Sequence, residues 1–434
     1  MADRKRRLSV DLTPLRTSRD FRLVFLSGAV TSFGSFISYV TIPYQVAKLT
    51  DDPLMVGLIG VCELAPILIM AFVGGALADF VDRRLLVRGS EAALALICGL
   101  LLINSLSAEP HLWLLYVCAF LTATFAGLQQ PAMGAMLPRL VKPEELPAAM
   151  ALKSLSMQFS QLIGPSLAGI LIATVDLAWV YTFDLLTFAV SLLLLTLVKA
   201  VPPPPAADRP SLSSVVTGLK YAKSRPELLG TYLVDINAMF FGMPSALYPF
   251  LADRLGGPEV LGLLYAAPAV GSMLATVGSG WTERVHRHGL MVIIAAAFWG
   301  VGIVGVGLSH MLWLTLFCLA FAGAADMVSG LFRMIIWNQT IPDHLRGRLA
   351  GIEMLSYTTG PLLGQLRSGL MARTSLGVGG SIWVGGALCV AGSLALAAAL
   401  PKFVRYDGEH GLALKQAADA EWAASAEARA ASAG

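Results

Sequence analysis

The amino-acid sequence predicts an all-α membrane protein with twelve transmembrane helices in two pseudo-symmetric six-helix bundles. Two features of its composition lead to this fold class. Hydrophobic residues make up 56% of the 434 residues and charged residues only 14%, whereas charged residues average about 25% in soluble proteins. The mean hydropathy is +0.70. Such a chain has too few polar side chains to cover the surface of a water-soluble globule, which favours a multi-pass membrane protein.

The third observation is the regular recurrence of apolar segments. A bilayer-crossing helix needs about 20 mostly apolar residues, and twelve segments meet this requirement. With the N-terminus placed in the cytoplasm, 27 Lys and Arg residues fall in cytoplasmic segments and 4 in external segments, as the positive-inside rule requires. We therefore expect a protein of the cytoplasmic (inner) membrane with both termini in the cytoplasm. The predicted spans are residues 21–48, 54–78, 85–107, 111–136, 148–174, 177–200, 227–252, 258–281, 289–309, 311–337, 346–373 and 377–400.

A linker separates the two predicted bundles. The sequence predicts an N-terminal six-helix bundle over 1–200, a cytoplasmic linker over 201–226, a C-terminal six-helix bundle over 227–400 and a cytoplasmic tail over 401–434. The linker begins with four prolines, Pro202 to Pro205, which form a stiff extended stretch. Apolar residues at helical spacing then predict an amphipathic helix on the membrane surface. An unstructured basic linker is the alternative.

Short segments recur in the two halves of the chain. The stretch VGGALADFVDRR (73–84) corresponds to VGSGWTERVHRH (277–288), and IGPSLAGIL (163–171) corresponds to TGPLLGQL (359–366). Parallel repeats of this kind place a substrate path between two bundles.

Several function classes are disfavoured. The net charge of +3 gives no basic field for nucleic acid. We find no nucleotide-binding loop, no HExxH and no GxSxG motif, so we expect no enzymatic activity and no cofactor. The five cysteines lie in apolar runs without CxxC spacing, so we expect no metal site. A membrane-embedded enzyme and a non-transporting sensor or scaffold are the rival classes, and neither has a supporting motif.

The end of the second predicted span carries a charged motif made of Gly75, Asp79, Arg83 and Arg84. Gly75 permits close helix approach. Asp79 stands at a helix C-terminus, where the macrodipole disfavours an acid, so another group must stabilise it. An arginine at the start of the eleventh span (Arg346 or Arg348) is a candidate partner. Such a bond predicts a gate that forms in one conformation only; the alternative is a simple basic turn after a helix-ending acid.

The fifth predicted span contains Gly164, Pro165 and Gly169. A proline kink together with small residues allows tight helix packing, and this combination suits a hinge or a seal. A kink without a gating role is the alternative.

Ionisable residues inside spans cost about 2.5–3.5 kcal/mol at a helix centre, so their presence suggests function. We expect candidate proton or substrate sites at these residues, among which Glu63 and Asp235 lie deepest in their spans. Asp326 and Arg333 are seven residues apart and share one helix face. The alternatives are a structural ion pair of Arg333 with Asp326 or Glu353, and a neutral acid bonded to a hydroxyl. The candidates are the ionisable residues Glu63, Asp184, Asp235, Asp326, Arg333 and Glu353, together with the uncharged Asn237 of the seventh span.

Uncharged polar residues accompany these acids and favour a bulky amphiphilic substrate. In the first span they form a stripe, and in the fourth and fifth spans they are glutamines. They are Ser27, Thr31, Ser35, Ser38, Tyr39, Gln129, Gln130, Gln158 and Gln161.

The chain resembles the major facilitator superfamily over nearly its whole length. GGALADFVDRR is similar to the superfamily's loop between helices 2 and 3, with Phe80 and Asp82 as departures, and GPSLAG is similar to the antiporter motif of exporters. Within the superfamily it most resembles the enterobactin exporter group, also called transmembrane secretion effectors. The segments that carry this likeness are LRTSRDFRLVFLS, QQPAMGAMLPRLV, VPPPPAADRPSLSSVVTGLKY and LYPFLAD…LGLLYAAPAVGS.

The resemblance implies a secondary active exporter that works by alternating access. Its partners would be protons, the lipid bilayer and a small-molecule substrate, either a siderophore or a hydrophobic drug, and we expect a monomer. Met133 stands where a basic residue is usual in this group, which implies altered substrate contacts. An importer or facilitator of the same fold is the alternative.

Overall fold

The computed structural model describes residues 11–199, 220–342, 345–408, 411–413, 415–416 and 419–420. Within these ranges, the side chains of residues 71–76, 78–80, 283, 347, 348, 350 and 351 lie outside the description. The described chain is almost entirely helical, which confirms the predicted all-α fold class.

Twelve long helical segments correspond to the twelve predicted spans. Ten helices among the described residues are long and apolar enough to cross a membrane. The other two segments are α9, which is short, and α14, which carries several charged residues. The segments are α2 (Arg19–Thr50), α3 (Pro53–Phe80), α4 (Arg83–Leu106), α5 (Leu112–Leu140), α6 (Leu146–Thr174), α7 (Leu177–Thr196), α9 (Pro226–Gly242) with α10 (Tyr248–Leu255), α11 (Pro258–Val277), α12 (His288–Leu308), α13 (Leu312–Thr340), α14 (Arg346–Ala372) and α15 (Gly377–Ala399).

Short helices connect or flank these segments. They are α1 (Thr13–Thr17), η1 (Pro143–Glu145), η2 (Ser245–Leu247), η3 (Ser279–Arg284) and α16 (Pro401–Val404).

The chain divides into two compact units. Of the described residues, unit 1 contains 11–51, 62–199 and 256–266, and unit 2 contains 52–61, 220–255 and those from 267 onward. Helices α3 and α11 therefore each contribute one part to either unit. The predicted bundle boundaries at 200 and 226 stay a prediction, because residues 200–219, with the proline run and most of the predicted amphipathic helix, lie outside the described residues.

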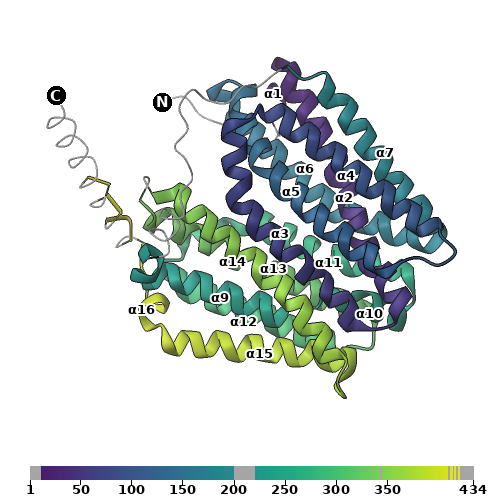
Figure 1. Ribbon diagram of the computed structural model, residues 1–434. Helices are drawn as coiled ribbons and strands as arrows, with labels where there is room; N and C mark the ends of the chain where they lie inside the picture. The colour runs from purple at the N-terminus through teal and green to yellow at the C-terminus, as the bar shows by residue number, and fades with distance from the viewer. Residues whose placement is uncertain are drawn as a thin grey trace. The chain divides into compact units, whose positions relative to one another are not determined.

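Unit 1 is built around α2. This helix packs against α6 and α7, and α4 packs against α5 and α7 (Figure 1). Near one end of the unit, Val24 of α2, Val87 of α4, Met136 of α5 and Leu195 of α7 form one buried apolar cluster. Lipid tails are as apolar as these side chains, so close packing and polar contacts, more than removal from water, hold membrane helices together.

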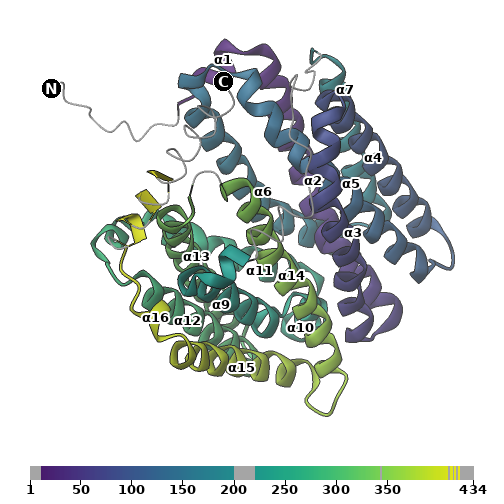
Figure 2. The same ribbon diagram turned by 60° about the vertical axis from the view of Figure 1, so that its left-hand side comes forward.

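Unit 2 is built around α12 and α9. Helix α12 packs along α13 and α15, and α9 packs against α14 and α15 (Figure 2). Gly300 of α12 and Gly386 of α15 face each other, and a Cβ added to Gly300 would lie 2.8 Å from the Gly386 carbonyl oxygen. Only glycine permits so close an approach of the two backbones.

The seventh span is broken, whereas the sequence predicted one segment over 227–252. Helix α9 ends at Gly242, and Met243 is extended with φ −97° and ψ 104°. Pro244 follows, and a proline disfavours the helical conformation in the residue before it. Arg367 of α14 supplies donors at this break: its Nε donates to the Phe240 carbonyl at 3.1 Å and its guanidinium to the Phe241 carbonyl at 2.5 Å.

The segment after α15 folds back onto unit 2. Phe403 of α16 is fully buried, and its ring fills the space beside Gly230 of α9 and Gly289 of α12. Tyr406 lies within hydrogen-bond distance of the Thr340 hydroxyl at the end of α13 (3.2 Å). This segment therefore ties the ends of three helices together.

Candidate functional site

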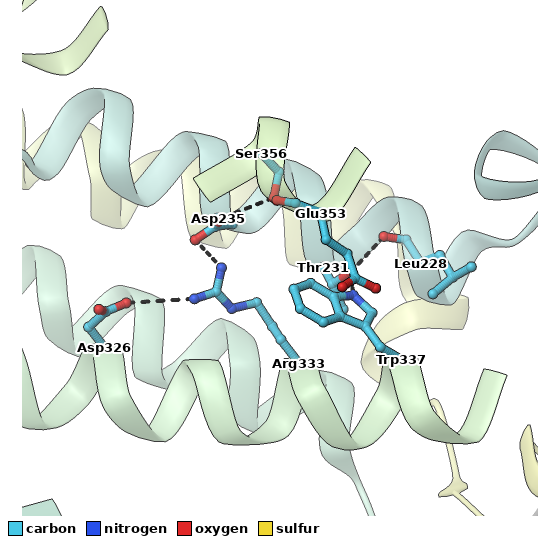
Figure 3. A network of polar contacts seen from close by, with 8 residues as sticks. All are labelled: Leu228, Thr231, Asp235, Asp326, Arg333, Trp337, Glu353 and Ser356. Atoms are coloured by element: carbon cyan, nitrogen blue, oxygen red, sulfur yellow. Dashed lines mark hydrogen bonds and ion pairs between the residues drawn. The ribbon is translucent and has the colours of Figure 1, made fainter. Parts of the chain in front are cut away.

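A buried ion-pair cluster connects α9 and α13 in unit 2 (Figure 3). The Arg333 guanidinium forms an ion pair with the Asp235 carboxylate, and the Asp326 carboxylate lies 3.8 Å from it. Ser356 of α14 donates a hydrogen bond to Asp235 at 3.2 Å. Asp235 is 3% exposed and Arg333 8% exposed. Two acids thus share one buried arginine.

The arrangement agrees with the shared face expected for Asp326 and Arg333 and adds a partner from another helix. Spacing along one helix could not indicate Asp235, which lies on α9. Glu353 lies on α14, one turn before Ser356, and its backbone carbonyl is a second acceptor within reach of the Ser356 hydroxyl, at 3.1 Å. The structure thus brings Asp235, Asp326 and Arg333 together, with Glu353 on the helix beside them (Figure 3).

Asn237 faces α15 instead of this cluster. Its amide donates to the Cys389 carbonyl at 3.0 Å and to the Ser393 hydroxyl at 3.2 Å. Gly392 leaves room for it, because a Cβ at residue 392 would collide with the Asn237 amide. The geometry fits a polar contact that fixes α9 on α15.

A second group of acids lies in unit 1. Asp184 of α7 is 1% exposed and accepts hydrogen bonds from Ser38 of α2 and from Thr187. Glu63 of α3 and Asp184 line the same pocket of about 140 Å³, together with Ser35 and Tyr39 of α2. The structure therefore brings two of the predicted acids to one pocket, along with most of the polar stripe predicted for the first span.

The sequence analysis missed Glu91 of α4, an acid that is 1% exposed. Thr31 of α2 donates to its Oε1 at 2.9 Å, and Ser191 of α7 donates to the same oxygen at 2.8 Å. Because Ser191 uses its only proton in this bond, Ser27 must donate to Ser191 across their 2.7 Å contact. Glu91 lies only eight residues after Arg83, close to the loop between α3 and α4. The sequence signal that could have indicated a buried polar partner is the pair of hydroxyls on α2, Ser27 and Thr31, which lie one helical turn apart.

The helix α6 continues through the predicted kink motif. At Gly164 it approaches α2, where an added Cβ would lie 2.7 Å from the Phe36 Cβ. At Gly169 it approaches the part of α11 that belongs to unit 1, where a Cβ would lie 2.6 Å from the Gly262 nitrogen. Both glycines, which flank Pro165, therefore permit contacts that a larger residue would prevent.

The loop motif between α3 and α4 is described only in part. The side chain of Asp79 and the surroundings of Gly75 lie outside the description. Arg83 is 6% exposed and donates to the Ala135 carbonyl of α5 at 3.1 Å. Asp82 is the N-cap of α4 and accepts a hydrogen bond from the Arg84 backbone at 2.9 Å, so the residue that departs from the superfamily pattern starts the next helix.

Known proteins match this chain over most of its length. A family model described as transmembrane secretion effector matches residues 9–420. Proteins named enterobactin exporter EntS from Shigella boydii serotype 18 (strain CDC 3083-94 / BS512) and Escherichia coli O6:K15:H31 (strain 536 / UPEC) are each 30% identical over 366 residues, which cover 82% of this chain and 86% of the relative.

Solved structures show the same fold at low sequence identity. A bacterial homolog of the human lysosomal transporter Spinster, in an inward-facing and unoccupied conformation, is 13% identical with a TM-score of 0.67, and the match covers 91% of this chain and 97% of that one. A mutant of the nucleoside transporter NupG is 10% identical with a TM-score of 0.73, covering 87% and 99%. The family match and the fold together lead to one conclusion: the chain is a multi-pass membrane transporter of the major facilitator superfamily and belongs to its transmembrane secretion effector family.

Proposed function

We propose that this transporter exports a siderophore or a related amphiphilic small molecule across the cytoplasmic membrane in exchange for protons. The observation that carries the direction and the substrate is the similarity to proteins named enterobactin exporter over 82% of the chain. The polar and apolar lining of the pockets in unit 1 supports an amphiphilic substrate. The protein works as a monomer with both termini in the cytoplasm.

Alternating access is the mechanism that we propose. Two bundles, over 1–200 and 227–400, rock against each other, and the linker over 201–226 connects them. In one of the two conformations, Asp79 bonds an arginine at the start of α14, Arg346 or Arg348, and this bond acts as the gate. In this proposal Gly164, Pro165 and Gly169 let α6 act as the seal or hinge.

Carboxyl groups inside the spans support proton coupling. A carboxyl group inside a span is costly, and Glu63 and Asp184 line one pocket in unit 1. In unit 2, Asp235 and Asp326 lie beside the same arginine, Arg333. In our proposal, protonation of one of these acids favours one conformation, and substrate favours the other.

Inverted membrane vesicles test the proposal with enterobactin as the probe. An acidic vesicle lumen drives its accumulation, and collapse of the pH gradient by a proton ionophore abolishes it. Glu63→Gln removes the dependence on the gradient. Thr122→Val is the matched control, because Thr122 lines the same pocket without a carboxyl group. Accumulation that continues after collapse of the gradient contradicts proton coupling, and accumulation equal to that of vesicles without the protein contradicts export of this probe.

A further inference from the structure

A pocket distinct from the one around Glu63 opens beside Glu91 in unit 1. It has a volume of about 160 Å³ and lies between α2, α4, α5 and α6. Its walls are mainly apolar, and its polar groups are Glu91, several amides and hydroxyls, and Lys153. The apolar wall includes Phe21, Phe25, Met133 and Met157.

The two hydroxyl donors to the Glu91 carboxylate, Thr31 and Ser191, both bond Oε1. The Gln129 amide of α5 also interacts with this carboxylate. Oε2 is buried and has no hydrogen-bond partner among the described residues. A buried carboxylate oxygen without a partner is costly, and this one belongs to a residue that lines the pocket. The carboxylate is therefore fixed in orientation with one acceptor oxygen left for a ligand.

The other polar groups of the pocket narrow the kind of ligand. Gln129 and Gln130 of α5 line it with amide groups, whose oxygens are further acceptors. Among the described residues that line the pocket, Glu91 is the only acid. Lys153 of α6 also lines the pocket and is exposed, and its charge disfavours a second cationic group on the ligand.

We infer that this pocket binds a single primary ammonium group carried on an apolar body, with the ammonium donating to Glu91 Oε2 and the body packed on the phenylalanines and methionines. An ammonium group has three donors, which suit Oε2 and the two glutamine oxygens, and methionine thioethers adapt to differently shaped apolar surfaces. The inference goes beyond the proposed function, because binding of such an ammonium ligand in this pocket does not require transport.

Three probes with the same 4-phenylbutyl group and different terminal polar groups test the inference. They are 4-phenylbutylammonium, the neutral 4-phenylbutanol and 4-phenylbutyltrimethylammonium, which is cationic without an N–H donor. Their affinities are measured by calorimetry on the purified full-length protein in lipid nanodiscs at pH 7. We expect the primary ammonium to bind about tenfold or more tightly than either other probe, because a hydrogen bond to a charged group is stronger than one between neutral groups.

Two variants and one control complete the experiment. Glu91→Gln is expected to remove the preference for the ammonium while keeping the binding of 4-phenylbutanol, which shows that the pocket is intact. Asp176→Asn removes an acid from unit 1 away from the pocket and is expected to change nothing. Gly28→Leu fills the pocket from α2, where an added Cβ meets only the Met133 methyl group at 3.3 Å, and is expected to abolish binding of all three probes.

Three results would overturn the inference. They are equal affinity of the wild-type protein for the three probes, an ammonium preference that survives in Glu91→Gln, and binding that survives in Gly28→Leu. Each of them leaves the export proposal standing, because that proposal is judged by enterobactin movement in vesicles. Conversely, vesicles that fail to move enterobactin while the ammonium preference holds refute the export of that probe alone.

Discussion

The Arg333 guanidinium on α13 forms an ion pair with the Asp235 carboxylate on α9, and both side chains are buried. The pair joins two helices that are far apart in the sequence. Removal of one partner leaves the other charge buried, which is more costly than removal of both.

Asp235→Ala is therefore expected to destabilise the protein by about 3–5 kcal/mol, seen as a lower midpoint of thermal unfolding in detergent. Asp326→Ala is the matched control: Asp326 is 3.8 Å from Arg333 and its side chain is 40% exposed, so a small effect is expected. The double variant Asp235→Ala with Arg333→Met is expected to recover part of the loss. A double variant as unstable as Asp235→Ala would contradict this account of the ion pair.

The proposed gate predicts different effects for two acids three residues apart. Asp79→Asn is expected to abolish enterobactin transport in vesicles while the protein still inserts in the membrane in normal amounts. Asp82→Asn keeps an N-cap residue at the start of α4, and Asn caps as well as Asp, so transport is expected to continue. Full transport by Asp79→Asn would remove the gate from the mechanism.

The close approach at Gly169 predicts a steric effect. Gly169→Ala places a Cβ 2.6 Å from the Gly262 nitrogen, and overpacking of this kind costs about 1–3 kcal/mol. Gly99 of α4 has no atom within 4 Å of an added Cβ, so Gly99→Ala is expected to be neutral or slightly stabilising, because alanine favours helix formation by about 1 kcal/mol over glycine. Thermal unfolding of the two variants provides the comparison, and equal midpoints would argue against the tight contact.

The segment after α15 predicts a packing effect. Phe403→Ala removes a fully buried ring beside Gly230 and Gly289, and such truncations cost about 3–5 kcal/mol. Lys402→Ala, at the exposed neighbour, is expected to leave stability unchanged. Unfolding followed by calorimetry measures both; a stable Phe403→Ala protein would mean that α16 does not hold the helix ends together.

The sequence predicted the twelve spans because apolar length is the main requirement that a bilayer sets. It did not predict the break after Gly242, although Pro244 was a visible signal, because prolines are tolerated inside many membrane helices. Here α3, α5 and α6 continue through Pro66, Pro131 and Pro165.

The candidate site was predictable only in part. Helical spacing relates residues on one helix, which is why Asp326 and Arg333 were paired from the sequence. Asp235 and Arg333 meet through packing of α9 on α13, and no local pattern encodes that contact. Glu91 was missed although it lies inside the predicted span over 85–107, because its burial against α2 and α7 depends on contacts between helices that no local pattern encodes.

The break in the seventh span has a consequence for biogenesis. Helix α9 has 17 residues, about 25 Å at 1.5 Å each, which is less than the roughly 30 Å of hydrocarbon in a bilayer. The backbone carbonyls at its C-terminal end accept hydrogen bonds from Arg367, a residue that is synthesised more than a hundred positions later. During translation, the Phe240 and Phe241 carbonyls therefore lack this donor until Arg367 has been synthesised, and a chain that ends before α14 cannot complete the break as the full-length protein does.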